Sequence, residues 1–226
     1  MCGRFTLTHL PKTQEVVLPE GMQLSLAPRY NIAPSQYCAV VPATDPERIH
    51  AFRWGLIPHW ATDDTAGYKT INARVETVLD RPAFRQAVRQ GRCLVLADGF
   101  YEWKKTGAGK QPYRIRLRSG RIFAFAGISD RWKRPDGVWL ESFSIITTPP
   151  NELMAGIHDR MPAILSDDAA LAWLDPRQDA EELVALLRPY EATGMEAYAV
   201  SQSVGNVKND FPKLMEPYQP PPTLFG

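Results

Sequence analysis

Residues 112–127 have the sequence PYRIRLRSGRIFAFAG, and this stretch decides the fold class. Side chains of different character alternate with a period of two along 113–118 and again along 121–127. Such alternation is typical of β-strands, whose successive side chains point to opposite faces. Ser119 and Gly120 lie between the two runs and are typical of a tight turn. The stretch therefore predicts a β-hairpin with strands at 112–118 and 121–127.

Short strand-like runs, bounded by Gly, Pro and Asp, occupy much of the remaining chain. They are 3–8, 38–42, 49–54, 93–97, 99–104, 139–147, 161–165 and 197–201. Helical segments are fewer. They are 80–92 with Asp80 as N-cap, 166–174 with Ser166 as N-cap, and an amphipathic stretch at 179–190 that ends before Pro189.

These elements predict a single α+β domain over residues 1–216. We expect its core to be a β-barrel-like, strongly bent, mainly antiparallel sheet with a few peripheral helices. The 226 residues suffice for one sizeable core, and 20 prolines spread among short strands favour a loop-rich fold. Residues 217–226 form a Pro-rich C-terminal tail.

Composition narrows the class of protein. No apolar run approaches the roughly 20 residues of a membrane helix, and the N-terminus lacks a secretory signal. We therefore expect a cytoplasmic protein with no membrane partner. The 3 cysteines have no CxxC spacing, which argues against a disulfide framework or a zinc site. His9, His50 and His59 lack metal-ligand spacing, so we expect no metal and no cofactor.

Charge is divided unevenly along the chain. Residues 1–135 hold 21 Lys+Arg and 11 Asp+Glu, about +10, whereas residues 136–226 hold 5 and 14, about −9, which together give the net +1. The basic first part predicts a face that binds a polyanion. An unevenly charged solvated surface is the alternative.

The chain begins MCGRFTLT, with a cysteine at position 2. Methionine aminopeptidases remove Met1 when the next residue is small, which would give Cys2 a free α-amine beside its thiol. The amine, with a pKa near ~7.7–8.0, condenses with an aldehyde to an imine. The thiol, with a pKa near ~8.5, then closes a five-membered thiazolidine ring. Alternatively Cys2 attacks an acyl carbon as an N-terminal nucleophile, or it is inert.

Three further segments carry candidate chemistry. In NARVET (72–77), Asn72 is a candidate to orient an amine or a carbonyl and Arg74 to hold a phosphate, the alternative being a capped turn with a surface arginine. In ADGFYEWKK (97–105), Glu102 lies beside aromatic residues, which favours a proton shuttle with a raised pKa. Its alternative is a salt bridge to a neighbouring lysine.

GIHDRMPAIL (156–165) places His158 in a loop before a strand. It is a candidate general acid or base, with Asp159 and Arg160 as candidates to orient it, or else a structural histidine. In RWGLIPHWA (53–61), Trp60 is a candidate to stack on a nucleotide base, whereas Trp54 is expected in the core.

Taken together, these segments resemble the SRAP (SOS response-associated peptidase) family, in particular its bacterial members. The matching pieces, in order, are MCGR, RYNIAPSQ, WGLIPHW, INARVET, ADGFYEW, IHDRMP and VSQSVGNVKN, from residue 1 to about 209. The resemblance implies a single α+β domain that binds single-stranded DNA at abasic sites. Its terminal cysteine forms a thiazolidine with the ring-opened sugar, and the resulting DNA–protein cross-link shields the lesion.

The resemblance also implies roles for individual residues. The catalytic set is Cys2 as nucleophile, Asn72 positioning the reacting group, Glu102 assisting proton transfers, and His158 opening the sugar ring or reversing the cross-link. The DNA-binding set is Arg4 and Arg74 on phosphates, Trp60 near the lesion, Thr147 lining the site, and Arg81 replacing an arginine that other members carry near Pro82. Ala61 stands where some bacterial members have a second tryptophan, which predicts a weaker wedge.

The expected protein is a nucleoid-associated monomer in the DNA damage response. Two activities stay open at this point: an abasic-site lyase, and an autopeptidase step that removes Met1. The alternative functions are an N-terminal-nucleophile cysteine peptidase or amidase, and a non-catalytic single-strand-binding module with Cys2 buried.

Overall fold

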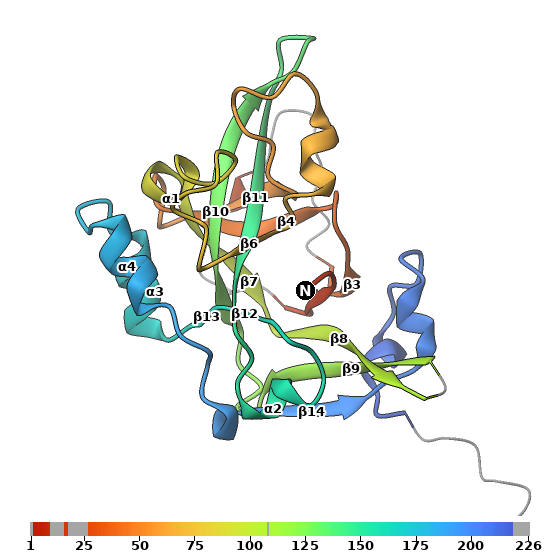
Figure 1. The fold of residues 1–226 in the computed structure, drawn as a ribbon. Coiled ribbons are helices and arrows are strands. Elements are labelled where there is room, and N and C mark those ends of the chain that lie inside the picture. The colour runs from red at the N-terminus through yellow and green to blue at the C-terminus, as the bar shows by residue number, and fades with distance from the viewer. Residues whose placement is uncertain (1, 10–15, 18–26, 108, 219–226) are drawn as a thin grey trace, which may run out of the picture.

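The computed structural model describes residues 2–9, 16–17, 27–107 and 109–218. Five strands form a closed barrel (Figure 1). In barrel order they are β11 (Trp139–Thr148), β10 (Phe123–Lys133), β7 (Arg92–Ala97), β4 (Tyr37–Pro42) and β5 (Ile49–Trp54). Neighbours are antiparallel except β5 and β11, whose parallel pairing of Trp54 with Phe143 closes the ring. Closure leaves the barrel without a free edge.

Four short strands extend the barrel sheet. They are β2 (Val16–Val17) on β5, β6 (Asn72–Arg74) and β12 (Met161–Pro162) on β11, and β13 (Ile164–Leu165) on β10. The predicted single strand 161–165 is thus divided. Ala163 lies at the division, where its N–H donates to Ile146 O and its carbonyl accepts from Ala126 N–H, so the segment crosses from β11 to β10.

A second, wholly antiparallel sheet lies beside the barrel, and only Asp98 separates its strand β8 from barrel strand β7. Its order is β14 (Met195–Ala199), β9 (Gly109–Leu117), β8 (Gly99–Thr106), β1 (Phe5–Leu7) and β3 (Arg29–Ile32). Phe5 of β1 packs 5.1 Å from the Trp54 ring and 5.9 Å from the Phe125 ring, both on barrel strands. Strand β1 therefore belongs to the second sheet and also packs against the barrel.

The hairpin predicted at 112–127 is wrong in its pairing. The turn exists, because Gly120 has φ +68° and its N–H donates to Leu117 O. However, β9 pairs with β8 and β14, whereas β10 pairs with β7, β11 and β13. The charged side chains of β9 find their partners in the second sheet, where Arg116 lies 2.6 Å from Glu196 of β14. The aromatic side chains of β10 enter the barrel core instead.

Four α-helices are found in the described part of the chain, and one of them begins after its predicted cap, Ser166. They are α1 (Ala87–Gln90), α2 (Glu152–Ala155), α3 (Asp167–Leu174) and α4 (Ala180–Leu186). Ser166 caps α3 and Asp179 caps α4 through hydrogen bonds to the first-turn N–H groups. Asp80 caps no helix, since 80–86 forms turns and α1 begins only after Gln86. Single turns of 3₁₀-helix occur at η1 (Asp64–Tyr68), η2 (Ala192–Gly194), η3 (Gln202–Gly205) and η4 (Pro212–Met215).

The α+β barrel-like fold is therefore confirmed. Trp54, Cys38 and Cys93 are buried as predicted. Near the C-terminus, Pro217 bridges Val200 and the Tyr218 N–H donates to Ala199 O at 2.7 Å. The domain boundary at 216 stays a prediction, and most of the predicted tail lies outside the described residues. No helix in the described ranges is long and apolar enough to cross a membrane.

Candidate functional site

Cys2 lies in the interior, where the barrel meets the second sheet. Figure 1 shows the red N-terminal segment between the barrel and β8. Cys2 is fully buried and belongs to the main hydrophobic cluster. Asn72 of β6 donates from Nδ2 to the Cys2 carbonyl at 2.8 Å. Asn72 Oδ1 is buried and accepts no hydrogen bond within the described residues. The backbone of Cys2 is therefore fixed from the barrel side, and a polar acceptor is left for a ligand.

The Cys2 thiol is held in its protonated form. Burial raises its pKa far above the usual range, and the nearby negative charge of Glu102 acts in the same direction. The Sγ atom lies 3.9 Å from Arg4 O, which is a weak hydrogen bond at most. At neutral pH this site therefore offers a thiol rather than a thiolate.

Glu102 of β8 and His158 come together from distant parts of the chain. Glu102 is 2% exposed, and its Oε2 lies 3.9 Å from His158 Nε2. Burial raises the pKa of Glu102, and the charge of His158 opposes this shift only in part. Glu102 thus has the raised pKa that its aromatic neighbours predict, which suits a group that gives and takes protons.

His158 follows α2, and its imidazole ring is held on both sides. The backbone N–H of His158 donates to Met154 O at 2.8 Å, which fixes the backbone at this residue. Its Nδ1 lies 3.0 Å from the Arg160 N–H and 2.9 Å from Asp159 Oδ1. With a side chain 26% exposed, the ring connects solvent to the buried Glu102.

Arg160 joins the His158 loop to the barrel. Its guanidinium donates to both carboxylate oxygens of Glu76, at 2.6 and 2.9 Å, and to Thr147 O at 2.5 Å. The hydrogen bonds from Arg160 hold the pKa of Glu76 below its usual range. Thr147 is fully buried on β11, opposite Arg74 of β6 in the parallel ladder. The sequence did not single out Glu76, although it lies inside the INARVET motif.

The guanidinium of Arg4 donates three hydrogen bonds within the described residues. It donates to Asn31 Oδ1 at 2.9 Å, to Val204 O at 2.7 Å and to Gly205 O at 3.1 Å. Asn31 is 1% exposed and donates to three carbonyls of the same segment, at 204, 206 and 209. Arg4 therefore links the chain start to η3, and its contact with a phosphate stays a prediction. The sequence missed Asn31, although RYNIAPSQ contains it.

The other predicted DNA contacts lie at the surface. Arg74 is exposed at the end of β6, two positions after Asn72. Trp60 is 58% exposed in the loop after β5, next to Ala61, whose carbonyl accepts from Trp132 Nε1 at 2.6 Å. Arg81 is exposed in the turns before α1. The structure thus gathers Cys2, Asn72, Glu102 and His158 at one site, whereas Trp60 and Arg81 lie on outer loops.

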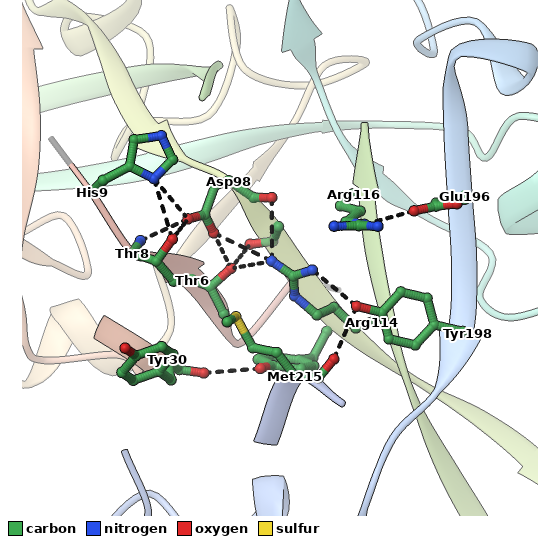
Figure 2. Close-up of polar contacts among 12 residues, drawn as sticks. Thr6, Thr8, His9, Tyr30, Asp98, Arg114, Arg116, Glu196, Tyr198 and Met215 are labelled. Atoms are coloured by element: carbon green, nitrogen blue, oxygen red, sulfur yellow. Dashed lines mark hydrogen bonds and ion pairs between the residues drawn. The ribbon is translucent and has the colours of Figure 1, made fainter. Parts of the chain in front are cut away.

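A second polar network anchors the strand that follows Cys2 (Figure 2). The buried Asp98 carboxylate accepts from Thr6 Oγ1, from Thr8 N at 2.7 Å and from Thr8 Oγ1 at 2.5 Å. Arg114 of β9 lies 3.5 Å from the same carboxylate and donates to Tyr198 OH of β14 at 3.0 Å. Strands β1, β9 and β14 of the second sheet are tied in this way to Asp98, which directly precedes β8.

No group of three or more His, Cys, Asp and Glu side chains within the described residues is placed to hold a metal ion. The side chains that the site brings together are a thiol, an amide, a carboxyl and an imidazole. This is a set for nucleophilic addition with proton transfer.

Comparison with known proteins decides the family. Residues 1–207 match the family described as SOS response associated peptidase (SRAP). The chain belongs to the SRAP family. A relative from Bacillus subtilis (strain 168), named abasic site processing protein YoqW, is 46% identical over 227 residues, covering 96% of this chain and 99% of the relative. Escherichia coli (strain K12) YedK, also named an abasic site processing protein, is 32% identical, covering 96% and 100%.

A solved structure has a similar fold. An X-ray structure of a Bacteroides thetaiotaomicron protein has a TM-score of 0.86 at 29% identity, covering 96% of this chain and 100% of that one. The resemblance inferred from seven short motifs is confirmed. The roles that the SRAP motifs imply for individual residues stay predictions.

Proposed function

We propose that this SRAP protein processes abasic sites in DNA by capturing the ring-opened sugar through Cys2, after Met1 has been removed. One observation supports this above all: Asn72 fixes the Cys2 backbone, while Glu102 and His158 lie at the same buried site. An amine, a thiol and two proton-transfer groups around one point are what an aldehyde trap needs.

The chemistry balances without any further reactant. The Cys2 amine adds to the sugar aldehyde carbon, and water leaves to give an imine. The thiol then adds across the imine, its sulfur bonding to carbon and its proton going to nitrogen. A protonated thiol supplies both atoms, which fits the raised pKa of Cys2. Glu102 carries protons to the departing hydroxyl and from the amine, for which its raised pKa is suited.

DNA binding in this proposal uses the basic first part of the chain. Arg74 and Arg81 are exposed cations for phosphates, and Arg4 at the start of the chain is a third candidate. Trp60 offers an exposed indole ring for stacking beside the lesion. Phosphate and stacking contacts are tolerant of sequence, as binding of a site that lacks a base requires. The protein acts as a monomer on single-stranded DNA, associated with the nucleoid.

Cross-linking is tested by mixing the protein with an abasic oligonucleotide and running a denaturing gel. We expect a shifted band for the wild type and none for Cys2→Ala, because the alanine variant lacks the sulfur that closes the ring. Cys38→Ala is the matched control, since Cys38 is equally buried but lies on β4. Reversible binding, measured with a tetrahydrofuran analogue that has no aldehyde, should be nearly unchanged in both variants.

Two results would contradict this proposal. One is a stable cross-link to a protein whose N-terminal amine has been acetylated. The other is equal loss of cross-linking and reversible binding in Cys2→Ala.

The family description as a peptidase favours a second reaction at the same residue, self-removal of Met1 with Cys2 as N-terminal nucleophile. Intact mass of wild-type and Cys2→Ala protein, both made in cells lacking methionine aminopeptidase activity, tests it. Loss of Met1 in the wild type alone supports self-processing, and retention in both contradicts it. A lyase activity would appear in the denaturing gel as cleaved oligonucleotide.

A further inference from the structure

Nδ1 of His158 lies close to two groups, of which one is a hydrogen-bond donor and the other an acceptor. The backbone N–H of Arg160 donates a hydrogen bond to Nδ1 at 3.0 Å, and a carboxylate oxygen of Asp159 lies 2.9 Å from the same atom, at ion-pair distance. The Arg160 N–H is a donor and needs a lone pair on Nδ1. The carboxylate is an acceptor and needs a proton there. A neutral imidazole carries one proton, so only one of the two contacts is a hydrogen bond at any moment.

The choice between the two partners decides what the other nitrogen offers. With the proton on Nδ1, Nε2 presents a lone pair and is a base. With Nδ1 accepting from Arg160, Nε2 carries the proton and is a donor. Nε2 is the atom that faces the site, 3.9 Å from Glu102 Oε2. The contacts of Nδ1 therefore set the chemistry available beside Glu102 and Cys2.

The two partners differ in how they are held. The side chain of Arg160 is fixed by Glu76 and by Thr147 O, and its own backbone N–H comes with it. The Asp159 side chain is 86% exposed. The donor is thus a built-in part of the loop, and the acceptor is a surface carboxylate that can be removed without disturbing the core.

We propose that Asp159 is a positioning residue that holds His158 with its proton on Nδ1, so that Nε2 faces the abasic sugar as a base. This inference rests on the proposed function for its substrate. The logic is that of a carboxylate that fixes a catalytic histidine in the tautomer its reaction needs. Arg160 N–H stabilises the opposite tautomer and becomes the partner of Nδ1 when the carboxylate is absent.

The step that this tautomer performs is ring opening of the closed sugar. Nε2 takes the proton of the C1′ hydroxyl, the C1′ carbonyl forms, and the C1′–O4′ bond breaks with its electron pair going to O4′. The imidazolium then returns a proton from Nε2 to O4′. The imidazole ring gains one proton at Nε2 and gives one back, while the proton on Nδ1 stays there, facing the Asp159 carboxylate. The product is the aldehyde with which Cys2 reacts.

The tautomer is measured directly by nitrogen NMR of protein labelled with ¹⁵N-histidine, without DNA. We expect the wild type to show a protonated Nδ1 and an unprotonated Nε2 at His158. In Asp159→Ala we expect the reverse, because the Arg160 N–H is then the partner that remains. Asp168→Ala is the matched control: it removes an exposed aspartate on α3 and should leave the His158 signals unchanged. A wild type with an unprotonated Nδ1, or an Asp159→Ala variant with unchanged signals, would overturn the proposal.

Kinetics give a second, independent readout. At saturating abasic oligonucleotide, the single-turnover rate of cross-linking should fall about tenfold or more in Asp159→Ala. The Kd for the tetrahydrofuran analogue should stay within about twofold. A slower rate together with a Kd that rises by well over twofold would mean that Asp159 acts in binding, which contradicts a positioning role. If the wild type forms no cross-link at all, the proposed function fails, while the NMR arms still decide the tautomer.

Discussion

Glu102 is the residue whose environment most clearly departs from that of an ordinary surface carboxyl. It is 2% exposed on β8, and burial raises its pKa. General acid–base groups of this kind contribute about 10²–10⁴-fold to a rate. We expect Glu102→Gln to slow cross-link formation or reversal by about 10²-fold, with binding of the tetrahydrofuran analogue unchanged. Quench-flow sampling on denaturing gels measures the rate, and unchanged kinetics would remove Glu102 from the mechanism.

The same variant has a pH-dependent effect on stability. A carboxyl whose pKa is higher in the folded than in the unfolded protein binds more protons when folded. Its stabilising effect is complete below its unfolded pKa of about 4.3 and is lost as pH rises through the folded pKa. Urea unfolding of the wild type and Glu102→Gln across this window should therefore show the glutamine variant gaining relative stability as pH rises. The opposite trend would contradict a raised pKa.

Individual site residues differed in how well the sequence predicted them. Cys2, Asn72, Glu102 and His158 came from recognisable motifs, and the structure brings them together. Asn31 could not be found in this way, because its role is to donate to carbonyls of a segment more than 170 positions away. A buried amide that serves distant backbone leaves no local pattern in a sequence.

At the scale of elements, strand positions were predictable and their partners were not. The short strand-like run at 49–54 predicts a strand, and β5 has these same bounds. The short strand β6, by contrast, is not among the predicted strands, and a capped turn is one of the alternatives for its segment. Its three residues are strand only because β11 lies beside them in parallel. Pairing across such sequence separations depends on tertiary packing, which local propensity does not record.

Asp98 joins strand β1 to its neighbours in the second sheet (Figure 2). It accepts from Thr6 and Thr8 of the first segment and faces Arg114, which is 5% exposed. Removing one partner of a buried charge pair costs about 3–5 kcal/mol. We expect Asp98→Ala to lower the free energy of unfolding by about 3 kcal/mol in urea, and Asp98→Asn, which keeps one acceptor, to lower it less.

A control variant distinguishes the stabilising effect of this buried network from that of a surface ion pair. Asp136 pairs with Arg134 at 2.9 Å, and both side chains are about half exposed. Screened surface pairs contribute little to stability. Asp136→Ala should therefore leave the urea midpoint nearly unchanged. Equal effects of Asp98→Ala and Asp136→Ala would show that the buried network does not anchor β1.

Strands from both parts of the chain build the two sheets, whereas the charges of the two parts differ in sign. Residues 1–135 carry about +10 and supply β6, the turns before α1 and the loop of Trp60. The acidic remainder includes α3 and α4, which Figure 1 shows on the flank of the barrel, away from the red N-terminal segment. A net charge of +1 conceals this arrangement. The proposed DNA face should therefore bind a polyanion although the molecule is nearly neutral.

Salt dependence tests this distribution. Each phosphate neutralised on a single strand contributes about −0.7 to the slope of log K against log salt. Arg74→Ala should weaken binding of the tetrahydrofuran oligonucleotide and reduce the slope by about 0.7. Arg177→Ala is the control, because Arg177 is exposed beside the acidic helices and bound to Asp175. A changed slope in Arg177→Ala with an unchanged one in Arg74→Ala would move the DNA to the other side of the molecule and away from Cys2.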